Sequence, residues 1–377
     1  MRIVIAPDKF KGSLSAEQVA QAVADGLRDE LPDAEIDLAP VADGGEGTVD
    51  AAVANGFARH GAVASGPLGD PVAATWAQRD DLAVIEMATA SGLELVPDAE
   101  RDALRASSRG TGDLIRAALG RGARRLVLAV GGSASTDGGA GMLAALGARL
   151  LDEEGREVPD GGAALARVRR VDLSGLDPRL VGAEVVLASD VDHPLLGARG
   201  AARVFGPQKG ASPADVETLD AALAVFADAL EAASGVAARD LPGAGAAGGV
   251  GFGALAALRA RRRAGVDVVL DLTRLADRLR GADLVVTGEG SLDEQSLGGK
   301  TPLGVARTAA AAGVPAVAVC GRSLLGEERW REAGFAACYA TSDRAVDAAA
   351  SIRDAAIHLR AIGRDIAAQH LAAVPRN

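Results

Sequence analysis

The chain has few of the residues that build metal and redox centres. Its two cysteines, Cys320 and Cys338, form no C-x-x-C motif, and its four histidines show no ligand-like spacing. We therefore expect no dedicated zinc site.

Positive charge and long apolar runs are also lacking. The formal net charge is -11, whereas nucleic acids and anionic membranes are bound by a basic surface. No run approaches the roughly 20 apolar residues of a membrane span, and the apolar start at residues 3–6 is too short for a secretory signal. We expect a cytoplasmic protein that binds a small molecule, without a nucleic-acid or membrane partner. The oligomeric state stays open, with a homo-oligomer among the alternatives.

Lysine is the scarcest charged residue. Only Lys9, Lys11, Lys209 and Lys300 occur among 40 basic residues, so the other 36 are arginine. Because arginine satisfies most surface positions, the remaining lysines are candidates for sites that need a compact ammonium. Three of them adjoin glycine. The alternative is that the four lysines remain by chance.

Short apolar runs that end in turn residues recur along the chain. They cover residues 2–8, 82–88, 125–132, 184–190, 283–290 and 314–321. Such runs predict buried, mostly parallel strands. Alanine-rich helical patterns lie between several of them, at residues 16–31, 112–119, 212–233 and 304–312. Alternating strands and helices predict an α/β fold.

We expect two α/β domains. Residues 1–60 and 280–377 would form a Rossmann-like or flavodoxin-like domain with a mostly parallel sheet, and residues 61–279 a second domain inserted between them. Asp8, Asp190 and Gly288 with Glu289 lie where predicted strands end. Because open α/β sheets bind ligands at the carboxyl ends of their strands, we expect the sites there.

SLGGKTP, residues 296–302, looks like the second half of a phosphate-binding P-loop. The full motif needs a glycine at position 294, which is Glu294. The segment is therefore not a P-loop, and the partial match does not support a nucleotide contact by Thr301. The longer segment 287–302 combines Glu289, Asp293 and Lys300, a set suited to a magnesium-bound nucleotide. The alternative is a polar loop with an ordinary ion pair.

GGSASTDGGAG, residues 131–141, follows a predicted strand and precedes a helical pattern at 142–151. Glycines at a helix start expose N–H groups that suit phosphate or carboxylate. The alternative is plain capping by Thr136 or Asp137.

Two further segments place polar residues at expected helix starts. In VADGGEGT, residues 41–48, Asp43 and Glu46 could bind substrate hydroxyls or magnesium. The alternative is a helix start with a near capping box, and both can hold at once. In SSRGTGDLI, residues 107–115, Arg109 could hold a substrate carboxylate in two hydrogen bonds or serve as a surface cap.

Asp190 lies at the end of the apolar strand that opens ASDVDHPLLG, residues 188–197. A carboxylate there can accept a proton from a hydroxyl nucleophile or hold magnesium. Turn formation by residues 192–194 explains Asp192 better than Asp190.

GAGAAG, residues 243–248, matches the dinucleotide-binding fingerprint. Because Pro242 and polar residues precede it instead of a buried strand, the context does not fit. We expect a turn leading into a helix that carries Arg259 to Arg263 as a solvated face.

Nine segments, taken in order, together resemble the signature blocks of the bacterial glycerate kinase family, type 1. They are PDKFKGSLSA, VADGGEGT, IEMATASGLELV, SSRGTGDLI, GGSASTDGGAG, ASDVDHPLLG, FGPQKGA, GAGAAGG and TGEGSLDEQSLGGKTPLGVA. The resemblance implies phosphorylation of D-glycerate with ATP and Mg²⁺, mainly on the 2-hydroxyl. It also implies two α/β domains with the active site in the cleft between them.

Phosphoryl transfer needs positioning, charge neutralisation and a carboxylate to orient the attacking hydroxyl. With the implied activity, we predict Asp190 and Lys300 as catalytic residues and Glu289 and Asp293 as magnesium ligands. The predicted substrate-binding residues are Lys11, Asp43, Glu46 and Arg109. The predicted nucleotide and phosphate contacts are Gly131, Gly132, Ser133, Lys209 and Gly288.

At three positions the residue differs from the one more common in the family's motifs. Thr136 and His193 stand where asparagine is frequent, and Ser291 stands where arginine is usual. No carboxylate or lysine is lost, but a phosphate contact at Ser291 is put in doubt. The alternatives are an NAD(P)-dependent hydroxy-acid dehydrogenase acting through GAGAAG and a non-catalytic small-molecule sensor.

Overall fold

The computed structural model describes residues 1–294 and 296–371, and it divides into two compact units. Unit 1 comprises Met1–Asp43, Asp50–Gly56 and the chain from Val266 onward. Unit 2 comprises Gly44–Val49 and Phe57–Gly265. The units are described separately, and the domain boundaries predicted above stay a prediction. In the described part of the chain, no helix has both the length and the apolar character that a membrane span requires.

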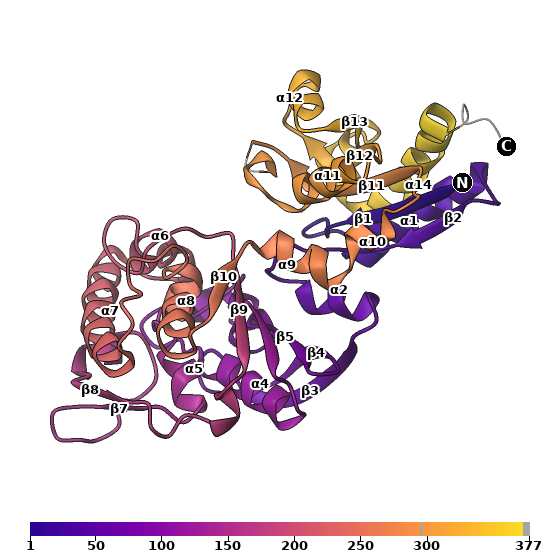
Figure 1. Ribbon diagram of the computed structural model, residues 1–377. Helices are drawn as coiled ribbons and strands as arrows, with labels where there is room; N and C mark the ends of the chain where they lie inside the picture. The colour runs from indigo at the N-terminus through magenta and orange to yellow at the C-terminus, as the bar shows by residue number, and fades with distance from the viewer. Residues whose placement is uncertain (295, 372–377) are drawn as a thin grey trace. The chain divides into compact units, whose positions relative to one another are not determined.

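Unit 1 is built on a five-stranded parallel sheet with the order β13-β12-β11-β1-β2 (Figure 1). Its strands are β1 (Arg2–Pro7), β2 (Glu35–Leu38), β11 (Leu284–Leu292), β12 (Ala316–Ser323) and β13 (Phe335–Ala340). The three central strands coincide with predicted apolar runs. The outer strands β2 and β13 were not predicted, because their residues are largely exposed or half-buried and form no continuous apolar run.

Two long helices of unit 1, α1 (Ala16–Glu30) and α14 (Ala355–Ile366), pack side by side (Figure 1). A Cβ on Gly26 would lie 1.9 Å from the carbonyl oxygen of Arg360, so only glycine permits this approach. The other α-helices that lie wholly or mainly in unit 1 are α2 (Thr48–Ala54), α9 (Gly265–Leu272), α10 (Leu275–Arg278), α11 (Thr301–Ala311), α12 (Glu327–Glu332) and α13 (Ala348–Arg353). A π-helical turn covers Ala367–Leu371.

Unit 2 contains a six-stranded sheet with the order β10-β9-β6-β5-β4-β3. The first four of these strands run parallel, and β4 and β3 complete the sheet antiparallel. The bounds are β3 (Ala58–Ser65), β4 (Pro71–Arg79), β5 (Leu82–Glu86), β6 (Arg125–Ala129), β9 (Glu184–Ala188) and β10 (Arg261–Arg263). A separate antiparallel pair is formed by β7 (Arg149–Leu151) and β8 (Arg170–Asp172). The predicted α/β fold with mostly parallel strands is confirmed.

The helices of unit 2 are α3 (Ala88–Ser91), α4 (Arg109–Gly120), α5 (Ala140–Ala145), α6 (Ala201–Phe205), α7 (Pro213–Ser234) and α8 (Ala246–Ala257). In Figure 1, α6, α7 and α8 gather on one side of this unit, and they contact one another. The rings of Phe226 and Phe252 meet edge to face, 6.0 Å apart, in the core between α7 and α8.

Two local predictions in unit 2 were wrong. Arg261 to Arg263 form β10, paired with β9, and not a helix face, because backbone pairing overrides the local pattern. The helix predicted at 142–151 ends early and gives way to β7. Gly147 bends the chain with φ +103°, and a Cβ there would lie 2.1 Å from the carbonyl oxygen of Gly175.

Candidate active site

In unit 1, polar groups gather where β1 and β11 end and α11 begins. Asp8 follows β1, and its backbone N–H donates to the carbonyl oxygen of Gly288 on β11 (2.8 Å). One Asp8 carboxylate oxygen accepts from the Thr301 hydroxyl (2.8 Å) and the other from the backbone N–H of Lys9 (2.7 Å). Because Lys300 is the N-cap of α11, the bond from Thr301 fixes the backbone that carries Lys300.

Burial and neighbouring negative charge raise the pKa of two carboxylates at this edge, Asp8 and Glu289. Burial, followed by the charge of Asp43, raises the pKa of Asp8 to about 7, against the hydrogen bond from Thr301. Burial also raises the pKa of Glu289, and the charges of Asp293 and Asp43 add to the effect. A bound cation would favour the ionised form of each carboxylate.

The predicted magnesium ligands fit a cation in part. Glu289 Oε1 is buried and has no hydrogen-bond partner among the described residues. Asp293 accepts from the backbone N–H of Ser296 (3.1 Å) and so also shapes its own loop. Within residues 1–294 and 296–371, no three His, Cys, Asp or Glu side chains are arranged as a ready metal site.

Gly288 and Lys11 also lie at the carboxyl edge of unit 1. A Cβ on Gly288 would lie 1.8 Å from the carbonyl oxygen of Val319, so contact with β12 explains this glycine without a ligand. Lys11 is exposed, in the turn that follows Asp8 and Lys9.

In unit 2, the glycine-rich turn 131–141 has an outer and an inner part. Gly131 is half-buried and Gly132 exposed, whereas residues 133–141 are buried. The outer part alone offers surface to a ligand.

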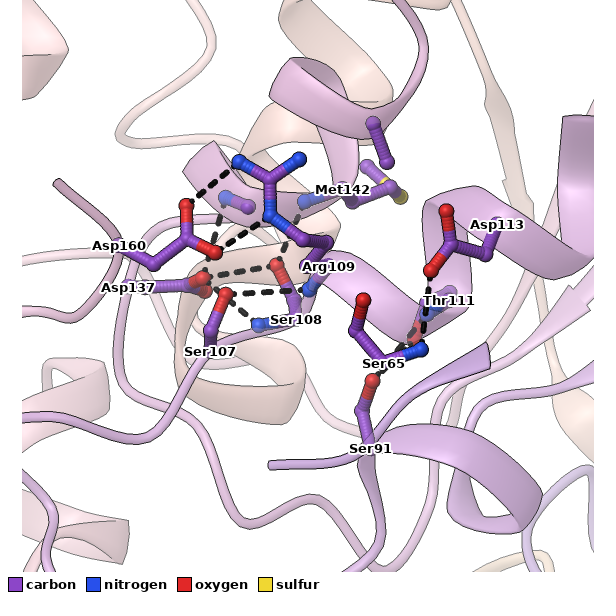
Figure 2. A network of polar contacts seen from close by, with 12 residues as sticks. Ser65, Ser91, Ser107, Ser108, Arg109, Thr111, Asp113, Asp137, Met142 and Asp160 are labelled. Carbon is purple, nitrogen blue, oxygen red and sulfur yellow. Dashed lines mark hydrogen bonds and ion pairs between the residues drawn. The ribbon is translucent and has the colours of Figure 1, made fainter. Parts of the chain in front are cut away.

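Asp137 occupies the centre of the inner part (Figure 2). Its carboxylate accepts from the Ser108 N–H (2.8 Å), the Ser108 hydroxyl (2.8 Å), and the N–H groups of Gly139 and Gly141 (3.1 Å each). The Ser108 hydroxyl accepts in turn from the Met142 N–H (3.0 Å). The N–H groups at the starts of α4 and α5 therefore already donate to side chains of the protein, which favours the capping interpretation for Asp137.

Lys209 and the GAGAAG segment pack against the same turn. The Lys209 ammonium donates to the Ser133 hydroxyl (2.8 Å) and to the Ser135 carbonyl oxygen (2.5 Å). The N–H of Gly138 donates to the carbonyl oxygen of Gly248 (2.9 Å). A Cβ on Gly248 would lie 2.0 Å from the Ser135 carbonyl oxygen, so GAGAAG provides close backbone packing here.

The segment that carries Glu46 lies against the outer turn. A Cβ on Gly131 would lie 2.5 Å from the Cα of Gly45. Glu86, which ends β5, accepts from the N–H groups of Gly47 (3.1 Å) and Val49 (2.9 Å). The alternative interpretation, a capping box formed by Asp43 and Glu46, is therefore wrong, because α2 begins only at Thr48 and a carboxylate from β5 receives these N–H groups.

Asp190 lies just beyond the carboxyl end of β9, two residues after the strand. It is exposed, and its Oδ1 accepts from the backbone N–H of Gly265 at the start of α9 (2.9 Å). This bond orients the carboxylate while leaving it accessible to a hydroxyl.

The Arg109 guanidinium is already paired. Its Nε and terminal nitrogen donate to the two carboxylate oxygens of Asp160 (2.5 and 2.8 Å; Figure 2). A substrate carboxylate at Arg109 would have to compete with Asp160.

The predicted residues thus form two groups. Lys11, Asp43, Gly288, Glu289, Asp293 and Lys300 lie in unit 1, and Glu46, Arg109, Gly131, Gly132, Ser133, Asp190 and Lys209 lie in unit 2. The sequence analysis placed Asp8 at a strand end where a site was expected but gave it no role, and it left out Thr301 and Glu86. Glu86 ends the apolar strand β5, a signal that could have identified it.

Comparison with known proteins identifies the family. The chain matches the model of the glycerate kinase family over residues 3–371. The chain belongs to the glycerate kinase family. It is 46% identical to the glycerate kinase of Bacillus subtilis (strain 168) over 98% of this chain and 97% of the relative. It is 49% identical to the glycerate 2-kinase of Escherichia coli (strain K12) over 85% of each.

A solved structure agrees with this membership. The crystal structure of a Salmonella typhimurium LT2 protein assigned as glycerate kinase 2 aligns with a TM-score of 0.87 at 42% identity, covering 98% of this chain and 97% of that one. The predicted family and the predicted enzyme class, a phosphotransferase with an alcohol group as acceptor, are confirmed. Membership in a kinase family implies the use of ATP.

Proposed function

We propose that this glycerate kinase family member phosphorylates D-glycerate on its 2-hydroxyl, with ATP and Mg²⁺, to give 2-phosphoglycerate. The observation that carries the proposal is the 49% identity to the Escherichia coli glycerate 2-kinase over 85% of both chains. The accessible Asp190 carboxylate and the clustered carboxylates of unit 1 are the chemical groups that this reaction needs.

We propose that Asp190 orients the attacking hydroxyl and accepts its proton. Its position after β9 and its bond from Gly265 hold the carboxylate in one orientation. General-base catalysis of this kind typically contributes 10²–10⁴-fold to the rate.

Lys300 would neutralise phosphate charge, held in place by Thr301 and Asp8. Gly131 and Gly132 would contact phosphate through their backbone, with Ser133 beside them. Lys11, Asp43, Glu46 and Arg109 remain the proposed contacts to glycerate, with Arg109 exchanging Asp160 for the substrate.

Glu289 and Asp293 would hold Mg²⁺. When bound, the ion supplies positive charge to the phosphate oxygens of the nucleotide. The buried Oε1 of Glu289, which lacks a partner among the described residues, supports its assignment as a ligand.

The test is incubation of the purified protein with D-glycerate, ATP and Mg²⁺. We expect ADP release that depends on glycerate, and a product whose ³¹P resonance is a doublet. Phosphate on C2 couples to one carbon-bound proton, whereas phosphate on C3 couples to two. A triplet would overturn the 2-hydroxyl assignment, and ADP release without glycerate dependence would overturn the activity.

The dehydrogenase alternative gains no support from the structure. Gly248 packs against Ser135 and Gly138 by close backbone contact, and a Cβ on Gly245 would lie 2.3 Å from the carbonyl oxygen of Pro194. A bound dinucleotide would have to displace that packing.

A further inference from the structure

Lys209 ends the short 3₁₀ turn Pro207–Lys209 in unit 2, and its side chain is enclosed by protein. The residue is 2% exposed and is among the largest fully buried side chains of the chain. The space beside it, lined by Leu93, Val96 and Ala134, has no room for a water molecule. A phosphate group could not touch the ammonium unless this packing opened.

The ammonium is directed at the glycine-rich turn instead. It bonds the hydroxyl of Ser133, the residue directly after the exposed Gly132, and the carbonyl oxygen of Ser135. Both partners belong to the stretch that connects the outer part of the turn to its buried inner part. Lys209 therefore fixes the point where the exposed backbone enters the core.

The backbone of Gly131 and Gly132, the outer part of the turn, needs a contact that fixes its conformation. Gly132 has φ +71°, in the left-handed region, where glycine has no steric preference for one conformation. Backbone bonds from Leu93 to the Gly132 carbonyl (2.8 Å) and from Ala134 to the Ser91 carbonyl (3.0 Å) flank the turn. Lys209 adds the side-chain bond that sets the rotamer of Ser133.

Charge and shape both explain why lysine occupies this position. An ammonium has three donors at one point, whereas a guanidinium spreads five donors over a planar fork. Gly210, with φ +93°, brings the following backbone against Arg101, where a Cβ would lie 2.9 Å from a carbonyl oxygen. Burial lowers the pKa of Lys209 to about 7, and the negative charge of Asp137 opposes the shift.

We propose that Lys209 is a positioning residue, which holds Ser133 and thereby the exposed Gly131 and Gly132 backbone in the geometry that binds nucleotide phosphate, without contacting phosphate itself. This inference rests on the proposed function, because it takes the outer turn as a phosphate contact.

A double-mutant cycle separates positioning from direct contact. The variants are Lys209→Met, Ser133→Ala and the double variant, and the readouts are KM for ATP, KM for glycerate, and kcat. We expect each single variant to raise KM for ATP about tenfold, since a bond to a charged group is lost. KM for glycerate should stay within twofold. The double variant should be no worse than Lys209→Met, because the bond that Ser133→Ala removes is already absent in Lys209→Met.

Multiplied effects of about 100-fold in the double variant would overturn the proposal in favour of a direct phosphate contact. An unchanged KM for ATP with a lower kcat in both single variants would also overturn it, since that pattern indicates a smaller active fraction. Should Lys209→Met not fold, Ser133→Ala decides alone: KM for ATP within twofold of the parent protein contradicts the inference. Arg203→Met is the matched control, because Arg203 lies on the nearby α6 and pairs with the exposed Glu217. Its KM for ATP should not change.

Calorimetric titration with ADP keeps this inference distinct from the proposed function. If the protein lacks activity on glycerate but binds ADP, a roughly tenfold weaker affinity in Ser133→Ala still supports the role of Lys209. Absence of ADP binding to the parent protein would overturn the role of the turn.

Discussion

The carboxyl ends of the parallel strands in the two units differ in their electrostatics. In unit 1, burial raises the pKa of Asp8 and of Glu289, and the negative charge of neighbouring carboxylates adds to both shifts. In unit 2, the buried Asp137 receives four hydrogen bonds and Lys209 donates two. Burial raises the pKa of Asp137 too, but the groups that face Asp137 are hydrogen-bond donors and not other carboxylates. The edge of unit 1 is therefore left in need of positive charge, whereas the charged groups of the turn in unit 2 are hydrogen-bonded within the unit.

The difference indicates a division of labour. A strained set of carboxylates gains stability when a cation or an ammonium approaches, and so suits a metal-bound nucleotide. The charged groups of the turn in unit 2 are hydrogen-bonded within the protein, although the buried hydroxyls of Ser135 and Thr136 have no partner among the described residues. A backbone held in this way is preorganised and binds a ligand at a lower entropic cost. Changes in unit 1 should therefore act through charge, and changes in unit 2 through geometry or through Asp190.

Asp190→Asn should give the largest loss of activity. The amide keeps the size and polarity of the side chain, but it cannot accept the hydroxyl proton. We expect kcat to fall 10²–10⁴-fold, with an unchanged thermal unfolding transition. Asp192→Asn is the control, because Asp192 pairs with Arg262 and should leave kcat within twofold. A kcat for Asp190→Asn within tenfold of the parent value would remove Asp190 from the chemistry.

The central architecture could be read from the sequence because the buried strands are continuous apolar runs. All six predicted runs are strands, among them β1, β6 and β11. The edge strand β2 and the short β10 escaped prediction, since exposed residues pair through their backbone and leave no apolar pattern. Pairing partners distant in sequence decide such segments.

The sequence pointed to candidate site residues by their type, but it could not show which of them are buried or which residues they contact. The rarity of lysine drew attention to Lys209, yet nothing local shows that its side chain is enclosed. Thr301 was set aside because it completed a failed P-loop match, and its bond to Asp8 spans 293 positions of sequence. Contacts of such range depend on the whole fold.

Lys300→Arg tests the charge-based side of the comparison. The planar guanidinium keeps the charge but cannot place it as a compact ammonium does. We expect kcat/KM for ATP to fall about 30-fold, the loss of one good charge-assisted bond. Arg307→Lys, on the exposed face of the same helix α11, is the reciprocal control and should have no effect. A fully active Lys300→Arg would show that any positive charge suffices there.

Glu289→Gln should weaken the response to magnesium. The amide removes one negative charge from the cluster and offers a poorer ligand. The Mg²⁺ concentration for half-maximal activity should rise about tenfold, with little change at saturating metal. Glu294→Gln, which alters an exposed partner of Arg329, should leave the magnesium titration unchanged. Identical titrations for both variants would exclude Glu289 as a ligand.

The smallest effect should be on the pH dependence of the free energy of unfolding. Its slope with pH should have opposite signs for Asp8 in unit 1 and Lys209 in unit 2. Asp8 has a pKa of about 7 in the folded protein and an ordinary value of 3.8, so the folded state binds more protons between these values. The free energy of unfolding should fall as the pH rises from about 4 to about 7. Lys209, at about 7 instead of 10.5, makes it rise from about pH 7 to about 10.

Asp8→Asn and Lys209→Met each remove one of these slopes. The Asp8 shift sets an upper limit of about 4 kcal/mol, and because side chains and solvent relax around a carboxylate we expect about 1 kcal/mol. Urea unfolding at several pH values measures it. As the pH rises from 4 to 7, the stability of Asp8→Asn should increase relative to that of the parent protein. As the pH rises from 7 to 10, the stability of Lys209→Met should decrease relative to that of the parent protein. Parallel curves for parent and variant would show that the corresponding group titrates normally, and the electrostatic contrast between the two edges would then be wrong.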